Sequence, residues 1–113
     1  VVKGRIDLNS FVALTATNHA KIYGLYPRKG TIAVGSDADI VLWDPKRKVT
    51  ISHDLIHDGA DYTPYEGLEV TGWPVMTMVR GKVVVDDGVL VGAKGYGSYL
   101  TRTKPPAHSA SQP

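Results

Sequence analysis

Four histidines are the side chains in this sequence best suited to hold a metal ion: His19, His53, His57 and His108. Imidazole is the commonest nitrogen ligand of zinc in proteins. His53 and His57 are four residues apart, which is close to the spacing of two ligands on one helical turn. No third or fourth ligand follows at a suitable spacing, and the absence of cysteine excludes a thiolate site. We interpret the pair as exposed loop histidines, with a metal site as the alternative.

Two carboxylates and one amide are the other candidates for chemistry. Asp37 and Asp39 are two residues apart, so on an extended strand they would share a face and resemble an acid/base pair. No nucleophile or base lies beside them, and we expect both side chains to bond nearby backbone N–H groups in a turn. Asn18 falls on the apolar side of a predicted helix, where its amide would tie the helix to the adjoining loop. A substrate contact by Asn18 is the alternative, and no residue is predicted to be catalytic, substrate-binding or metal-binding.

The first element predicted along the chain is a helix over residues 7–25, which would position Asn18 and His19. Asp7 is a suitable N-cap, and Gly24 allows the left-handed residue that ends a helix. Thr17 could cap a new start, so we expect one kinked helix or two short ones. Apolar and amide side chains recur every three or four residues and predict one packed face, made of Leu8, Phe11, Leu14, Asn18, Ile22 and Leu25.

After Pro27 the pattern becomes short extended runs separated by turn residues. Residues 31–34 form a short extended piece, and residues 38–43 predict a strand that is buried on at least one face and ends at Asp44-Pro45. Residues 53–74 have no sustained period and predict a long irregular loop. Such loops usually pack on something else, here another domain or subunit, through Tyr62, Tyr65 and Trp73.

The last third predicts a three-stranded meander followed by an extension. Its strands are residues 75–79, 82–85 and 89–91, and each hairpin has glycine in its turn, at Arg80-Gly81 and at Asp87-Gly88. From Gly92 onward the large apolar side chains are too sparse for a core. We expect an extension that contacts a neighbouring subunit through Tyr96, Tyr99 and Leu100, with docking back on its own chain as the alternative, and a mobile tail at its end.

Length and charge narrow the class of protein further. The 113-residue chain starts at Val1, has a net charge of +2 and contains no apolar run of the ~18 residues that span a membrane. We expect a piece of a longer protein, at most one domain, that buries roughly 60 to 70% of its unfolded surface. Its basic clusters lack interleaved aromatic residues, so we expect neither nucleic acid nor a membrane as partner.

The stretch from Gly24 to Pro45 carries the most specific motif. Its core is Lys29-Gly30-Thr31-Ile32, then Gly35, then Asp37-Ala38-Asp39-Ile40-Val41. It resembles the cyclic amidohydrolases, and within them the D-hydantoinase and dihydropyrimidinase branch. The same branch is indicated by Trp43-Asp44-Pro45, Asp61-Tyr62, Tyr65-Glu66-Gly67, Thr71-Gly72-Trp73-Pro74 and Arg80-Gly81-Lys82. The resemblance covers residues 4–102.

The resemblance implies an α+β segment of a two-domain parent protein, a (β/α)8 TIM barrel joined to a small β-sandwich. The segment would contribute the last barrel helix and the C-terminal strands of the sandwich. The implied division is residues 1–30 for the end of the metal-dependent barrel domain, 31–52 for sandwich strands, 53–74 for a loop on the barrel or a subunit, 75–91 for the meander, and 92–113 for the extension and tail.

The implied activity is hydrolysis of the ring amide of hydantoins or dihydropyrimidines in the cytoplasm, as in pyrimidine degradation. The branch uses two divalent metal ions, usually zinc, and every ligand belongs to barrel segments before Val1. The segment itself would then be inactive, with the other segments of the parent chain and further copies of it, in a dimer or tetramer, as its partners. Two alternatives remain: a non-catalytic relative of the collapsin response mediator type, or a stand-alone β-rich binding module.

Overall fold

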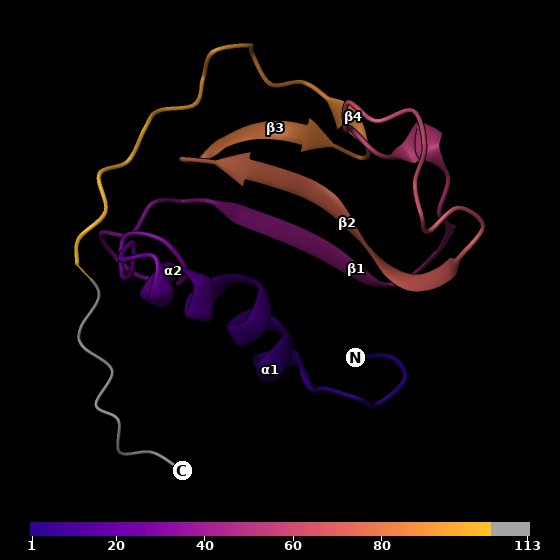
Figure 1. The fold of residues 1–113 in the computed structure, drawn as a ribbon, viewed down its shortest axis with the longest axis horizontal. Helices are drawn as coiled ribbons and strands as arrows, with labels where there is room; N and C mark the ends of the chain where they lie inside the picture. The colour runs from indigo at the N-terminus through magenta and orange to yellow at the C-terminus, as the bar shows by residue number, and fades with distance from the viewer. Residues whose placement is uncertain (105–113) are drawn as a thin grey trace. The chain divides into compact units, whose positions relative to one another are not determined.

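The structure, a computed structural model, describes residues 1–104 and divides them into two compact units (Figure 1). The helical unit contains Lys3–Asp37 and the C-terminal segment from Gly97, and the sheet unit contains Ala38–Tyr96. Helix and antiparallel strands therefore occupy separate stretches of sequence, which is an α+β organisation. The tail predicted for residues 105–113 lies outside the described residues, and so does His108.

A single helix forms the helical unit. It runs from α1 (Leu8–Val12) through a π-helical segment (Ala13–Thr17) into α2 (Asn18–Ile22), and the residues at both junctions have helical dihedral angles. Asp7 caps the start, because its Oδ1 accepts the Ser10 N–H at 2.7 Å. Gly24 ends the helix with φ 70°, as predicted. A new α-helical stretch does begin at Asn18, as predicted, but Thr17 is itself helical and makes no capping bond, so the predicted cap is wrong.

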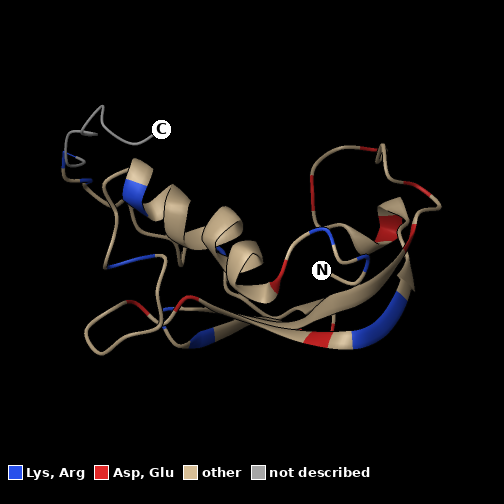
Figure 2. Ribbon diagram, turned by 90° about the horizontal axis from the view of Figure 1, so that it is seen from below, with Lys and Arg blue, Asp and Glu red and all other residues tan. Residues whose placement is uncertain are grey.

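The packed face of this helix is the one that carries small side chains, Ala16 and Ala20. Ala20 is 5% exposed, and a Cβ on Gly30 would lie 2.5 Å from the Ala20 Cβ and 3.2 Å from the Ala16 carbonyl oxygen. The predicted apolar face is covered only in part, since Phe11 and Leu25 are half-buried while Leu8 and Ile22 are 68% and 55% exposed. The helical turns carry almost no charged residues (Figure 2). Both faces of the helix are therefore suited to contact protein, but the predicted one is covered only in part within residues 1–104.

The sheet unit is a four-stranded antiparallel sheet in the order β1-β2-β3-β4. Its strands are β1 (Ile40–Thr50), β2 (Glu69–Val79), β3 (Lys82–Asp86) and β4 (Val89–Leu90). The predicted meander is confirmed as β2, β3 and β4. Both turn pairs have positive φ, with 47° and 79° at Arg80 and Gly81 and 44° and 79° at Asp87 and Gly88, as tight hairpins require.

The first strand differs from the prediction in both length and burial. Asp44-Pro45 does not end it, because the chain forms a bulge there and resumes pairing at Lys48 with Thr71. The Asp44 carboxylate accepts the Lys46 N–H at 2.9 Å inside this bulge. β1 is also not buried, since Trp43 is 49% exposed and most of its other residues are exposed too. No strand covers residues 31–34 in the described chain.

The irregular loop is shorter than predicted. Trp73 belongs to β2, where it pairs with Asp44, so the loop extends only from Ile51 to Leu68. It contains one 3-10 turn, His53–Leu55. The loop closes on itself, since the Ile51 N–H donates to the Leu68 carbonyl and the Gly67 N–H to the Ile51 carbonyl.

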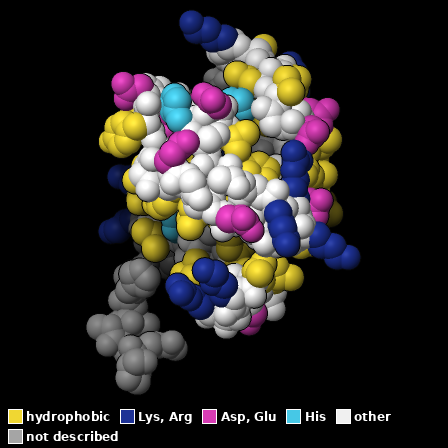
Figure 3. All heavy atoms as spheres, turned by 90° about the vertical axis from the view of Figure 1, so that its right-hand side faces the viewer, with side chains coloured by type: hydrophobic (Ala, Val, Ile, Leu, Met, Phe, Trp, Pro, Cys, Tyr) yellow, Lys and Arg dark blue, Asp and Glu magenta, His cyan; other side chains and the backbone are white. Residues whose placement is uncertain are grey.

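The chain as a whole exposes much surface. Large hydrophobic side chains are exposed in both units, with Ile32 82% exposed in the helical unit and Leu90 63% exposed in the sheet unit. Hydrophobic side chains reach the surface between charged ones on the face drawn in Figure 3. Within residues 1–104, no helix has the length and apolar character needed to cross a membrane.

Candidate functional site

Asp37 lies in an ion-pair cluster of the helical unit. Its Oδ2 lies 3.0 Å from the Arg28 Nε and 2.9 Å from the Lys29 Nζ. Its N–H donates to the Arg28 carbonyl at 2.9 Å, so backbone and side chain both return to the same loop. Hydrogen bonds from Lys29 and then Arg28 hold the pKa of the Asp37 carboxyl below its usual range. Its side-chain partners are therefore cations and not the turn N–H groups that we expected.

Asp39 fastens a hairpin of the sheet unit. Its Oδ1 accepts the Arg80 N–H at 2.9 Å, and next to it the Gly81 N–H donates to the Ala38 carbonyl at 2.9 Å. The partner is a backbone N–H, as predicted, but it belongs to a turn 41 residues away. Asp37 and Asp39 thus serve different units through different partners. This arrangement stabilises the fold and does not form a carboxylate pair.

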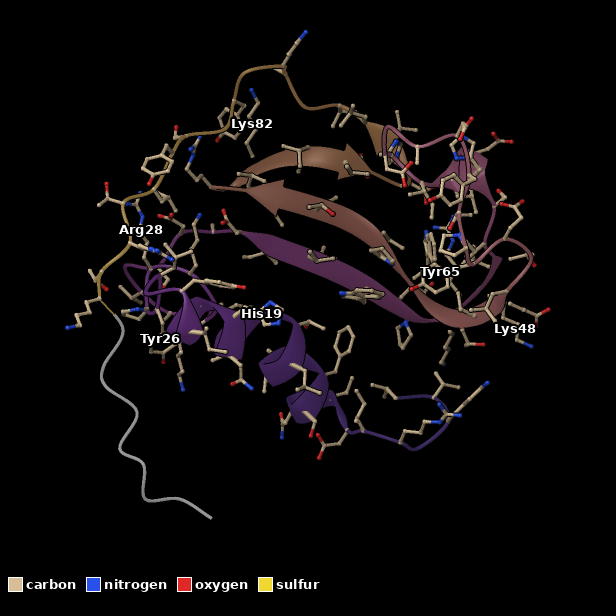
Figure 4. All side chains as sticks on the ribbon, in the orientation of Figure 1. His19, Tyr26, Arg28, Lys48, Tyr65 and Lys82 are labelled. Carbon is tan, nitrogen blue, oxygen red and sulfur yellow. The ribbon has the colours of Figure 1, made fainter. Side chains whose placement is uncertain are left out.

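The histidines have separate environments. His19 is an exposed residue of α2, seen in Figure 4. The His57 Nε2 lies 3.0 Å from the Gly88 carbonyl oxygen, which joins the loop to the β3–β4 turn. The His53 Nδ1 is buried and has no hydrogen-bond partner among residues 1–104, while its backbone N–H donates to the Glu66 carboxylate at 2.8 Å. In the described part of the chain, no three His, Asp or Glu side chains gather as a metal ion would require.

The hydrogen bond between helix and loop is made by Thr17 and not by Asn18. Asn18 is exposed, so the expected buried amide is wrong. The Thr17 hydroxyl instead donates to the Gly30 carbonyl at 2.6 Å. The π-helical segment explains the error, because it shifts the helical phase that the apolar spacing assumed.

Two contacts hold the C-terminal segment to its own chain. Tyr96 packs against Arg80 and Lys82 of its own sheet and so follows the alternative to the predicted subunit contact. Thr103, which the sequence analysis did not single out, bonds to Gly24 of its own helix. Both join residues that are far apart along the chain, so no local spacing indicates them. Asp37, Asp39 and His57 therefore stabilise turns and loops of residues 1–104 through hydrogen bonds and ion pairs.

Known proteins resemble this chain over nearly all of its length. The profile of the amidohydrolase family matches residues 1–84. A D-hydantoinase of Ralstonia pickettii is 52% identical over 104 residues, which cover 92% of this chain and 23% of that protein. A dihydropyrimidinase-related protein 5 of Mus musculus is 48% identical over 99 residues, covering 88% of this chain and 18% of that protein.

The fold resembles solved structures equally closely. The crystal structure of D-hydantoinase from Bacillus sp. AR9 superposes with a TM-score of 0.90 at 51% identity, over 94% of this chain and 23% of that one. This chain thus spans about a quarter of the length of the relatives it matches. With most of its residues matched by the family profile and half of them identical to those of D-hydantoinases, the chain belongs to the amidohydrolase family.

Proposed function

We propose that this chain is the C-terminal part of a cytoplasmic hydrolase that opens the ring amide of hydantoins or dihydropyrimidines, and that its own role is structural. The observation that carries the proposal is the 52% identity to a D-hydantoinase over 104 residues. The division into a helical and a sheet unit supports residues 1–30 as the end of the barrel domain, and residues 31–52 and 75–91 as sandwich strands on either side of the loop 53–74.

The exposed apolar surface supports a structural role. Leu8 and Ile22 of the helix are 68% and 55% exposed, and Trp43 on the edge strand β1 is 49% exposed. Exposed apolar side chains gathered on one element mark surfaces that contact other protein. We infer that other segments of the same polypeptide cover the outer face of the helix and the open edge of β1. This surface also disfavours a stand-alone binding module.

The proposed divalent metal ions, zinc by resemblance, do not fit the residues of this segment. A dinuclear site needs several histidine and carboxylate ligands in one place, and residues 1–104 contain no such group. Asp37 and Asp39 each have partners already. We propose that the metal ligands and the groups that read the substrate belong to other parts of the protein.

The second candidate is a non-catalytic protein of the same fold. The 48% identity to a dihydropyrimidinase-related protein favours it. Against it stands the Thr71-Gly72-Trp73-Pro74 sequence on β2, which we associate with the bacterial enzymes. The two candidates differ in residues outside this chain, so the full-length gene product decides between them.

Activity separates the candidates. We expect the full-length gene product to hydrolyse hydantoin or dihydrouracil when supplied with zinc, cobalt or manganese, and the 113-residue chain alone to be inactive under the same conditions. Turnover by the chain alone above a metal-only blank would overturn the structural role. A folded full-length product without turnover or bound metal would establish the non-catalytic candidate.

We also propose that the protein is a homodimer or homotetramer in which the extension contacts a neighbouring subunit. Tyr99 supports this, because it is 93% exposed in a segment otherwise poor in large side chains and isolated aromatics are frequent anchors of interfaces. Truncation after Val91 and the milder Tyr99→Ala are expected to reduce the mass in solution while leaving the metal content unchanged. An unchanged oligomer in both variants would rule the assembly role out.

A further inference from the structure

The segment from Gly92 to Lys104 has no helix or strand of its own, yet it is held at two points. We infer that it is a strap fastened to its own chain by two independent locks, one formed by Tyr96 on the sheet unit and one by Thr103 on the helical unit. This inference goes beyond the proposed function, because it concerns how the segment is retained and not what the parent protein hydrolyses.

In the first lock, two cationic side chains contact the Tyr96 ring. The Arg80 guanidinium lies 4.4 Å from the centre of the Tyr96 ring, and the Lys82 Nζ lies 5.0 Å from it. Both distances are within the range of cation–π attraction. Lys82 extends from the start of β3 in Figure 4, beside the turn that bears Arg80. The two charges therefore come from one hairpin.

Hydrogen bonds fix Tyr96 in both directions. The Arg80 Nη2 donates to the Tyr96 carbonyl, and the Tyr96 hydroxyl donates to the Val79 carbonyl at 3.2 Å. Arg80 is itself positioned, because Asp39 accepts its backbone N–H. The lock thus rests on a hairpin turn that is already fastened at its other side.

The second lock requires a glycine. The Thr103 N–H and hydroxyl both donate to the Gly24 carbonyl, at 2.9 and 3.1 Å. Gly24 has φ +70°, and a Cβ on it would collide with the Thr103 carbonyl oxygen. Gly24 therefore meets two separate requirements, the left-handed cap of the helix and the open space into which the strap settles.

The two tyrosines of the strap differ in exposure. Tyr96 is partly buried by its own sheet, whereas Tyr99 is 93% exposed. Of the two tyrosines, Tyr96 retains the strap and Tyr99 remains available to a neighbouring molecule. A segment held on both sides loses less conformational entropy when its exposed residue binds.

Trypsin tests both locks, because Lys94 and Arg102 lie beside Tyr96 and Thr103 and cleavage requires the segment to open locally. In the full-length gene product, Tyr96→Leu is expected to accelerate cleavage after Lys94 on the order of tenfold. Tyr96→Phe retains the ring but loses the hydroxyl bond to Val79, so its rate should lie between those of the parent and Tyr96→Leu. Arg80→Ala removes one of the two cations and the bond to the Tyr96 carbonyl, so it should also accelerate this cleavage. Combining it with Tyr96→Leu should give less than the sum of the two effects, since both weaken one lock.

Gly24 variants test the second lock through cleavage after Arg102. Gly24→Ala introduces both a strained φ and the Cβ, whereas Gly24→Asn introduces the Cβ in a residue that tolerates positive φ. Both are expected to accelerate cleavage after Arg102 several-fold without changing cleavage after Lys94. Mass spectrometry of the products and a melting curve of each variant identify the cut and exclude general unfolding. Unchanged cleavage after Lys94 in Tyr96→Leu, or after Arg102 in both Gly24 variants, would overturn the inference.

Discussion

Gly30→Ala is expected to lower the free energy of local opening of the helix by about 2 to 5 kcal/mol. An ordinary glycine-to-alanine change in a loop has a smaller effect. Gly30 has φ +84°, and placing an alanine in a left-handed conformation costs ~1 to 2 kcal/mol. The new methyl group would lie 2.5 Å from the Ala20 Cβ and 3.2 Å from the Thr17 Cα. Overpacking of this kind typically adds ~1 to 3 kcal/mol.

Gly35→Ala is the matched control for this prediction. Gly35 has a similar φ of +89°, but nothing lies within 4 Å of the position of its Cβ. It should therefore lose only the ~1 to 2 kcal/mol of backbone strain. The difference between the two variants isolates the clash with the helix.

Hydrogen exchange of the amides in residues 13–22 is the appropriate assay, because it reports local opening of this helix within the full-length gene product. Ala20→Gly should offset much of the defect when combined with Gly30→Ala, although alone it weakens the helix by ~1 kcal/mol. Equal effects of Gly30→Ala and Gly35→Ala, or simple additivity of Gly30→Ala with Ala20→Gly, would refute the close packing of Gly30 on Ala20.

Two further outcomes follow from the ion-pair cluster and from the open strand. The pKa of Asp37 lies below its ordinary value of 3.8, so its pairing should contribute fully above that pH and be lost as the pH falls through 3.8 toward the lower pKa of the folded state. Exchange of the amides in residues 28–37 should rise over that window, and Asp37→Asn should remove the dependence. The isolated 113-residue chain should aggregate or melt without a sharp transition, because β1 is an exposed edge strand. Trp43→Lys should raise its soluble fraction in sedimentation, whereas a monomer with a sharp reversible melt would contradict the expectation.

The features predicted correctly from the sequence are those set by a few adjacent residues. A side-chain oxygen at Asp7 suffices for an N-cap, and a glycine in a two-residue loop suffices for the hairpins at Gly81 and Gly88. The glycines of the family motif also occupy turns that require them, since Gly30 and Gly35 both have positive φ.

The errors concern features that depend on distant residues. Asp44-Pro45 ends many strands, but here β2 continues to pair on both sides of it, and the bulge accommodates the proline. The burial of the apolar strand and of the helix face was inferred from their composition, whereas it depends on which surfaces the remaining polypeptide covers. Asp39 was assigned correctly to an N–H group, but its partner at Arg80 is reached only after the sheet has formed.

The bond between Gly24 and Thr103 has a consequence for how the protein is made. The two residues are 79 positions apart, and the whole sheet unit is encoded between them. At ~5 to 20 residues per second, a ribosome needs about 4 to 16 seconds to travel from one to the other. During that interval the hairpins between β2, β3 and β4 can form, because their residues are neighbours in the chain. The Gly24 carbonyl cannot yet accept its bonds from Thr103. A message that ends before the codon for Thr103 would therefore yield strands β1 to β4 but leave the Gly24 carbonyl, just after the helix, without the two bonds from Thr103.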